Sequence, residues 1–228
     1  MKKIAQFILV PILILGTLGL TSCEKKGSGL PVDGDGNEYD TVVIGTQVWL
    51  AENLKTSRYN NGISIPLVTD NTQWTEMISA AFCWYNNQPE KFKDGYGALY
   101  NWWAANVSYL CPVGYHVPNE VEWETLINYL GGEGMAGGRL KEPGTVYWAY
   151  PNDCNENVTG FNARGGGGRS DTDGTFGGIR EGGVWWAFKV YLSFPDSKRI
   201  DMSHDHWSAE IKGAWKEPGM SVRCVKNK

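Results

Sequence analysis

The sequence predicts an α+β domain with two short helices, short twisted antiparallel strands and one long irregular loop region. One segment carries a full set of helix signals, and several short segments rich in β-branched and aromatic residues are bounded by turn residues. Residues 133–183 consist mostly of Gly, Asn, Asp, Pro and Thr. The 29 glycines among 228 residues suit a chain with many left-handed backbone positions. No internal repeat and no second domain is visible.

The strongest helix signals lie at residues 119–130. Asn119 is the predicted N-cap, and Glu122 three residues later completes the spacing of a capping box. One face is apolar, because four residues recur at helical spacing: Trp123, Leu126, Ile127 and Leu130. Gly131-Gly132 ends the helix. Pro118 keeps the preceding residues extended, so His116 falls in a short strand, and we interpret it as a core histidine with a hydrogen-bonded ring.

A second helix is expected at residues 98–105, where ALYNWWAA places Leu99, Trp102 and Trp103 on one side. Asp70 is expected to cap a brief helical turn near Trp74. Both helical segments are short, so strands and loops make up the rest of the domain.

The strands are predicted from alternating or continuous apolar segments between turn residues. They are expected at 38–43, 47–51, 82–85, 184–194, 198–202 and 221–225. Residues 184–194 and 198–202 should form a hairpin across Pro195-Asp196-Ser197. The long region Glu133–Gly183 is expected to be irregular but packed down by isolated apolar anchors, and such regions tend to carry function.

The N-terminus predicts export and lipidation. Lys2 and Lys3 precede a short apolar run, Phe7 to Leu20, and small residues then lead to Cys23. These residues resemble the bacterial lipobox, which implies cleavage before Cys23 and acylation of its sulfur; the alternative is an ordinary signal peptide with an incidental cysteine. We therefore expect residues 1–22 to be a lipoprotein signal peptide, 23–34 a flexible tether and 35–228 a single domain. Acyl chains on Cys23 would anchor the protein in the cell envelope, at the outer membrane or cell surface.

Composition argues against nucleic acid as a partner. Removal of a leader that holds two lysines and no acid takes the net charge from −4 to −6 and leaves 206 residues, enough for one domain with a core. There is no basic run that could follow a phosphate backbone.

No metal or cofactor is predicted. Asp33, Asp35 and Asn37 match the first ligands of a calcium loop, but the later Gly and Glu are missing, so a turn is favoured. His204 and His206, with Asp201 and Asp205 beside them, could chelate a metal from one face of a strand, yet no third ligand is identifiable and a solvated strand end is favoured. Besides Cys23 there are four cysteines, which allow three disulfide patterns.

No catalytic residue is predicted either. A histidine with a recognisable nucleophile in reach is missing. The run Arg164-Gly-Gly-Gly-Gly-Arg169 lacks the Lys-Ser/Thr ending of a phosphate loop and is interpreted as a tight loop whose arginines bond carbonyl groups.

The aromatic residues could form a platform for sugars, with Asn and Arg side chains bonding hydroxyl groups. In a strand pair such as Trp185-Trp186, one ring points into the core and the other outward, so about half of these residues are core. The candidate ligand-binding residues are Trp84, Asn86, Asn87, Trp103, Arg164, Arg169 and Trp185.

A set of motifs carries a family resemblance. In chain order they are TVVIGTQVWLAENL, FCWYNN, YGALYNWWAAN, LCPVGYHVPNEVEW, GGRLKEPGTVYW, TGF, WW and SVRC. Together they resemble the Fibrobacter succinogenes major paralogous domain, common in lipoproteins of Bacteroidetes-type bacteria. That family is similar to the formylglycine-generating-enzyme-like branch of the C-type lectin-like fold.

The resemblance implies that the first and last strands pair and that the long-loop region is the ligand face. With the central and closing strands side by side, Cys111 is expected to pair with Cys224, while Cys83 and Cys154 pair or stay free. The chain departs from the family pattern at Cys154 and at Ala187-Phe188-Lys189, which puts a ligand preference carried over to that segment in doubt.

The leading hypothesis is a cell-envelope lipoprotein with a non-enzymatic binding or adhesion domain for a carbohydrate or a surface protein. The ligand would be contacted by the Glu133–Gly183 loops and neighbouring aromatic residues. One alternative is a structural subunit of a surface assembly, and the other is an enzyme of the formylglycine-generating type.

Overall fold

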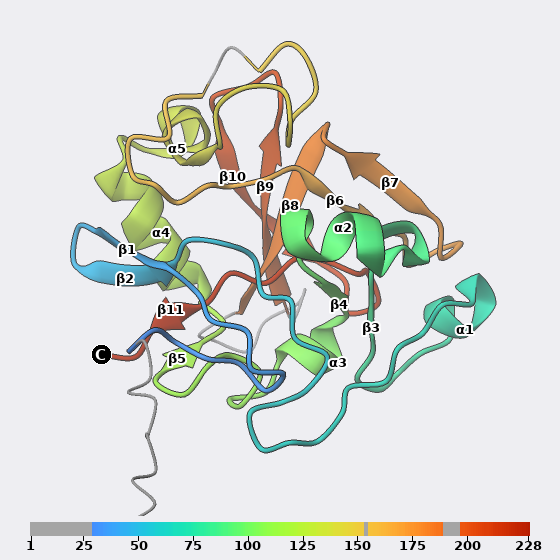
Figure 1. Cartoon of the computed structure of the whole chain (residues 1–228). Coiled ribbons are helices and arrows are strands. Elements are labelled where there is room, and N and C mark those ends of the chain that lie inside the picture. Colours follow the sequence, from blue (N-terminus) through green and yellow to red (C-terminus); the bar gives the residue numbers. More distant parts are fainter. Residues whose placement is uncertain (1–28, 153–154, 189–196) are drawn as a thin grey trace, which may run out of the picture.

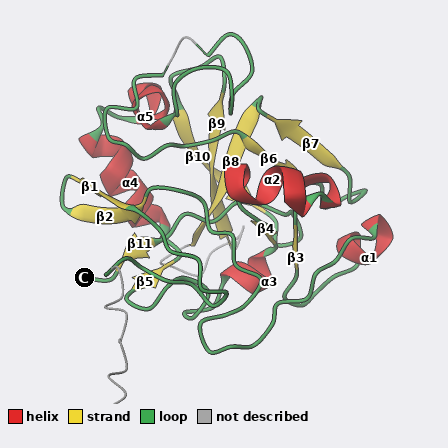
Figure 2. Cartoon of the chain, in the orientation of Figure 1, coloured by secondary structure: helices red, strands yellow, loops and turns green. Residues whose placement is uncertain are grey.

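The computed structural model describes residues 29–152, 155–188 and 197–228, and these form the mixed α+β domain that the sequence predicts (Figures 1 and 2). The helices are α1 (Asn71–Thr75), α2 (Pro89–Tyr96), α3 (Trp102–Ala105), α4 (Glu120–Tyr129) and α5 (Glu133–Leu140), with a 3-10 turn, η1 (Tyr85–Asn87).

The strands lie in three sheets. A four-stranded sheet has the order β1 (Thr41–Ile44), β2 (Gln47–Leu50), β11 (Val225–Lys226), β5 (Tyr115–His116). A five-stranded sheet has the order β10 (Ala209–Ala214), β9 (Ser197–Ser203), β8 (Gly182–Phe188), β6 (Gly166–Arg169), β7 (Phe176–Ile179). The remaining pair is β3 (Phe82–Cys83) with β4 (Leu99–Tyr100).

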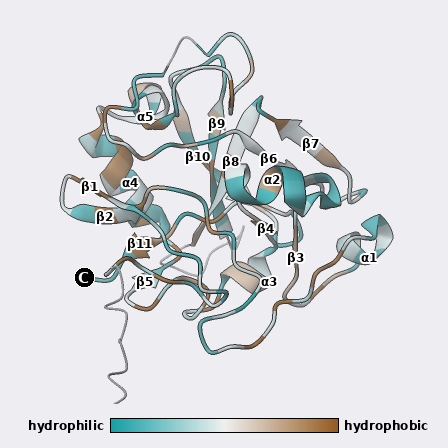
Figure 3. Cartoon of the chain, viewed as in Figure 1, coloured by the Kyte–Doolittle hydropathy of each residue, from teal (hydrophilic) through white to brown (hydrophobic). Residues whose placement is uncertain are grey.

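Helix α4 matches its prediction. The Asn119 side chain accepts from the Glu122 N–H at 3.0 Å, and the Glu122 carboxylate accepts from the Asn119 N–H at 3.0 Å. The predicted apolar face is buried, and Gly131, at φ +96°, follows the helix end. Figure 3 shows hydrophobic and hydrophilic residues alternating along α4, as expected for a helix with one buried face.

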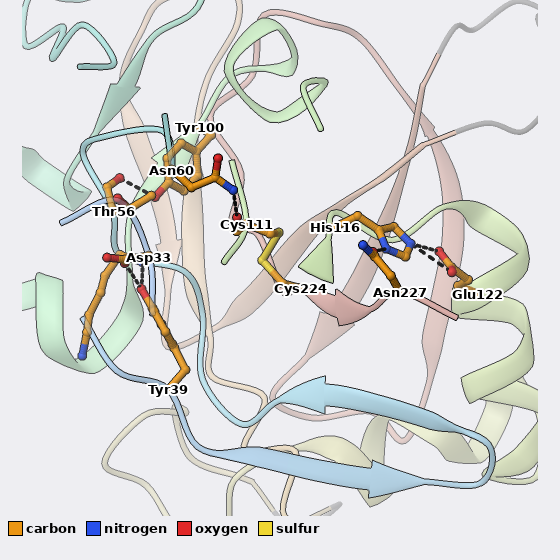
Figure 4. The surroundings of a disulfide bond; sticks show 11 residues. Asp33, Tyr39, Thr56, Asn60, Tyr100, Cys111, His116, Glu122, Cys224 and Asn227 are labelled. Atoms are coloured by element: carbon orange, nitrogen blue, oxygen red, sulfur yellow. Dashed lines mark hydrogen bonds and ion pairs between the residues drawn. A yellow bond between two sulfur atoms is a disulfide. The ribbon is translucent and has the colours of Figure 1, made fainter. Parts of the chain in front are cut away.

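The last strand, β11, pairs with β2 and not with the first strand, β1, so the pairing that the family resemblance implies is displaced by one strand. Val225 of β11 lies between Trp49 of β2 and His116 of β5. Next to this contact Cys111 and Cys224 form the expected disulfide, with their Cα atoms 6.0 Å apart (Figure 4). Cys83 is buried and is not in a disulfide, whereas Cys154 lies outside the described residues.

The interpretation of His116 as a core histidine is wrong, because its side chain is 31 % exposed. Its ring is hydrogen-bonded on both sides, as expected (Figure 4). Nε2 lies 2.9 Å and 3.0 Å from the two Glu122 carboxylate oxygens, and Nδ1 lies 2.7 Å from Oδ1 of Asn227. The ring therefore joins β5, α4 and the segment after β11.

Stability should fall as the pH rises past the pKa of His116. Its hydrogen bond to Glu122 outweighs burial and raises the pKa of the imidazole. Burial alone would raise the pKa of Glu122, but the hydrogen bonds from His116 and Asn119 outweigh it and lower the pKa. The histidine contribution is complete below the unfolded value of about 6.5 and is lost as the pH rises through the folded pKa. The glutamate contribution is complete above about pH 4.3 and is lost as the pH falls through its folded pKa.

The pair is thus expected to add about 0.5–1 kcal/mol between about pH 4.5 and 6.5, and less at pH 8.5. Denaturant unfolding of the wild type and of His116→Gln at pH 5.5 and 8.5 measures this. The wild type should lose more stability between the two pH values than the variant does, and equal losses would contradict the assignment.

Both tryptophans of the Trp185-Trp186 pair are buried, although one was expected to face outward. The two rings do point to opposite faces of β8. Trp185 packs in the core formed with α4 and α5, and Trp186 packs in a second core with Tyr100 and the disulfide. At this point of the chain both faces of the sheet are covered, so alternation along the strand does not separate core from surface.

The prediction of a helix over residues 98–105 is wrong in its first half. Leu99 and Tyr100 pair with β3, and the helix begins only after Asn101, whose side chain accepts from the Ala104 N–H at 3.0 Å. The strand predicted at 82–85 is likewise shorter, because η1 begins at Tyr85. Helix α2 and strand β10 were not predicted.

Residues 133–183 are not one irregular region, since they contain α5, β6 and β7. The glycines in α5 lower its helix propensity, so the sequence did not predict this helix. Close packing nevertheless requires them. A Cβ on Gly137 would lie 2.1 Å from the Ser208 carbonyl oxygen, and one on Gly138 would lie 2.1 Å from the Trp207 ring. Close packing of α5 on the β10 side therefore overrides its weak helix propensity.

The predicted hairpin between residues 184–194 and 198–202 is present as antiparallel pairing of β8 with β9. Its expected turn and the end of its first strand fall in residues 189–196, outside the described part, apart from Ser197, which begins β9. In the described part of the chain, no helix is both long enough and apolar enough to cross a membrane.

Candidate functional site

A groove runs over one face of the five-stranded sheet, the face that carries Val184, Arg199 and Asp201. One part, of about 440 Å³, is lined by β6, β7, the start of β8 and residues 218–220. An adjoining part, of about 300 Å³, is lined by β8, β9, β10 and the β9–β10 turn. The two parts share Gly182 and Val184, so we treat them as one site, the sheet groove, whose size is typical of ligand sites.

Arg169 fixes the β6–β7 wall of the groove. Its side chain is 2 % exposed and donates to the carbonyl groups of Gly174, Val68, Thr69 and Asp70 and to the Asn71 side chain. The guanidinium lies between the rings of Trp74 and Phe176, 4.5 Å and 4.7 Å from their centroids. All three nitrogens of the buried guanidinium are thus hydrogen-bonded, and the side chain ties the β6–β7 wall to the segment before α1.

Glycines leave the groove open. A Cβ on Gly177 would meet no atom within 4 Å, and one on Gly182 would meet only the Met202 carbonyl oxygen at 3.7 Å. Neither residue has a positive φ. Their lack of side chains is therefore not required by the backbone, and it keeps the groove accessible.

Four charged residues line the sheet side of the groove: Arg199, Asp201, Glu210 and Lys212. They form ion pairs at 2.8 Å (Arg199–Asp201), 3.3 Å (Lys212–Asp201) and 2.7 Å (Lys212–Glu210). The hydrogen bond with Lys212 lowers the pKa of Glu210, and the same bond raises the pKa of Lys212. Both groups stay ionised near neutral pH, which suits them to binding charge and not to exchanging protons.

Buried Lys141 holds the β9–β10 turn at the end of the groove. Its ammonium donates to the carbonyl oxygens of Ser203, His204 and His206 at 2.8, 3.0 and 2.8 Å. The two histidines lie in this turn, and His206 contacts Asp205. Within the described residues, no group of three or more His, Cys, Asp or Glu side chains is placed to hold a metal ion.

The Asp33 segment forms a turn. The Asp33 carboxylate accepts from the backbone N–H groups of Asp35 and Asn37, from the Asn37 amide and from the Tyr39 hydroxyl. These donors occupy the oxygens that a calcium ion would need. The carbonyl of Pro31 accepts from the Tyr39 N–H at 3.0 Å, so the chain is held to the domain at this point.

The seven predicted ligand-binding residues all lie in the described part, and they do not come together. Trp84 and Trp185 are 7 % and 0 % exposed and belong to the core, so a ligand cannot stack on them in this structure. Arg169 lines the groove, but its donors already bond the protein. Arg164 donates to the Gly95 carbonyl and pairs with Glu142, which agrees with the interpretation of arginines that bond carbonyl groups.

The other three predicted residues are more accessible. Asn86 is exposed and Asn87 is half-buried, both with positive φ, and the Asn87 amide donates to the Thr69 carbonyl at 3.0 Å. Trp103 is half-buried on α3, beside Trp102. None of the three lines the sheet groove.

The sequence prediction missed the charged residues of the groove. Glu210 and Lys212 lie on β10, which was not predicted. Arg199 and Asp201 lie on a predicted strand, where Asp201 was considered only as a metal ligand beside the two histidines. A usable signal was the alternation of charged with apolar residues in both segments, RIDM and EIK, which is typical of strands with one covered and one open face.

The comparisons with known proteins give a family. The model of the Fibrobacter succinogenes major domain matches residues 42–226. A search of curated proteins found no match to this chain, and a search of solved structures found none either, so the lectin-like fold stays a prediction. Since the match covers most of the sequence, the chain belongs to the Fibrobacter succinogenes major domain family.

Proposed function

We propose that the protein is a cell-envelope lipoprotein whose domain binds a carbohydrate or a surface protein without catalysis, in the sheet groove. The observation that carries this is an open groove with ionised, mutually paired side chains, lined in part by residues of the predicted ligand region. Acylation of Cys23 supplies the anchor, as the sequence before it predicts.

The cysteines also favour binding over an oxidase activity. An enzyme of the formylglycine-generating type uses a reactive cysteine pair. Here Cys111 and Cys224 are fully buried and bonded to each other, and burial raises the pKa of the Cys83 thiol to about 12. Among the described cysteines, none offers an accessible thiolate, the form that reacts.

The anchor is tested with Cys23→Ser in the full-length chain expressed in a lipoprotein-processing bacterium. The wild type should be found in the membrane fraction, with an acylated N-terminal cysteine in its mass spectrum, whereas Cys23→Ser should leave that fraction. Cys83→Ala is the matched control, because it removes a cysteine and keeps the anchor. Membrane retention of Cys23→Ser, or an unmodified Cys23 in the wild type, would refute the lipoprotein assignment.

A further inference from the structure

Like charges lie opposite one another on the sheet side of the groove. The register of β9 and β10 places Arg199 opposite Lys212 and Asp201 opposite Glu210. Directly opposed like charges destabilise a sheet, and exchanging the two residues of either strand would remove the conflict. Ion pairs along each strand and across the diagonal offset the repulsion. The result is a pair of cations beside a pair of carboxylates.

Both pairs are accessible from the groove. The side chains of Lys212 and Glu210 are 47 % and 45 % exposed, and those of Arg199 and Asp201 are 35 % and 21 % exposed. Because the residues of each strand are two positions apart, the backbone positions of the cation pair and of the carboxylate pair are about 7 Å apart along the strands. Their charged ends lean toward one another and meet in the ion pairs at 2.8, 3.3 and 2.7 Å. An extended peptide repeats its side chains on one face at the same spacing.

We propose that the sheet groove binds an extended peptide segment of a surface protein, with an acidic and a basic side chain two positions apart. The carboxylate of the segment contacts Arg199 and Lys212, and its ammonium or guanidinium group contacts Asp201 and Glu210. Val184, which is opposite Asp201 in the register, gives the segment an apolar contact between the charges. This inference rests on the proposed function and selects a protein ligand over a carbohydrate.

Charge complementarity is the argument for a peptide. A neutral sugar is held by hydroxyl contacts and by stacking on exposed rings, but Trp84 and Trp185 are buried, and Phe176 is the aromatic residue among those that line the groove. A neutral sugar would also offer no charge to either pair. A segment with both charges would relieve the repulsion within each pair.

The test uses synthetic peptides as probes. One blocked nonapeptide of Ser and Thr carries Lys and Glu two positions apart, and a second carries them at adjacent positions, where the side chains point to opposite faces. Calorimetric titration of the wild-type protein should show binding of the first peptide at least about tenfold tighter than of the second, a difference of about 1.4 kcal/mol. Equal affinities, or no binding below about 1 mM, would overturn the inference.

Protein variants identify the contact. Asp201→Asn with Glu210→Gln should weaken binding of the first peptide about tenfold, and should not weaken binding of a peptide in which Gln replaces Lys. Glu90→Gln with Glu124→Gln is the control, because these exposed carboxylates on α2 and α4 give the same change in net charge and do not line the groove. If both double variants lost the same affinity for the first peptide, the proposed contact of its cation with Asp201 and Glu210 would be overturned.

A glycan array run with the wild type and with Gly177→Trp separates the two levels of the proposal. In one outcome a glycan binds the wild type, Gly177→Trp abolishes this glycan binding, and neither peptide binds. The peptide inference is then overturned, and ligand binding in the groove stands. If Gly177→Trp changes the binding of neither peptide nor glycan, the groove is not the site and both proposals fall.

Discussion

Replacing Asn53 with leucine is expected to lower the free energy of unfolding by about 3–5 kcal/mol. Asn53 is 5 % exposed, and its Oδ1 accepts from Arg223 Nη2 at 2.8 Å, Arg223 Nε at 3.2 Å and Trp185 Nε1 at 2.8 Å. Leucine has a similar volume, so the change removes the acceptor and leaves the packing. Two buried donor groups, one of them charged, would then lose their partner.

The size of this effect comes from the buried charge. Arg223 is 0 % exposed, and burial lowers its pKa to about 9. Its remaining acceptors are the carbonyl groups of Leu50, Phe161 and Asn162. Asn53 follows β2, Trp185 lies on β8, and Arg223 lies just before β11. Because Trp185 and Arg223 both donate to Asn53 Oδ1, this side chain joins the two main sheets.

Denaturant unfolding of the wild type, Asn53→Leu and Asn128→Leu measures the prediction. Asn128 is exposed on α4, and leucine suits a helix, so the control should stay within about 0.5 kcal/mol of the wild type. A loss of less than about 1 kcal/mol for Asn53→Leu would show that Arg223 finds other acceptors or water.

Gly177→Trp is expected to abolish ligand binding and to leave the fold intact. The new side chain would start in open space, without a positive φ to strain it, and would extend into a groove of about 440 Å³. The free energy of unfolding should change by no more than about 0.5 kcal/mol, as for other surface substitutions. A ligand that needs the groove would lose its room, whatever its chemistry.

Gly134→Trp is the matched control. Gly134 is exposed on α5, a Cβ there meets no atom within 4 Å, and the residue does not line the groove. It introduces the same aromatic surface elsewhere. Any loss of binding shared by the two variants would come from the added tryptophan and not from its place.

Local signals were enough to predict α4. The cap at Asn119, the apolar spacing and the terminal glycines are all read within a dozen residues, and tertiary packing acts in the same direction. The Cys111–Cys224 disulfide joins residues 113 positions apart, so its prediction needed the family resemblance, which places the central and closing strands together.

Features that depend on distant contacts escaped prediction. In the sequence, the glycines of α5 indicate a loop. In the structure they allow close packing against the Ser208 carbonyl and the Trp207 ring. Trp185 was predicted to contact a ligand because the sequence does not show that both faces of β8 are covered and that the core of α4 and α5 covers the Trp185 face. The charge pairs of the groove exist only through the register of β9 and β10, which tertiary contacts set.

The sheet groove is proposed to be the ligand-binding surface of the domain. The most direct test of this proposal is calorimetric titration of the peptide with Lys and Glu two positions apart into the wild type, Gly177→Trp and Gly134→Trp at equal protein concentration. The groove predicts that the wild type and Gly134→Trp bind with the same affinity and that Gly177→Trp shows no binding. Equal binding by all three proteins would contradict it.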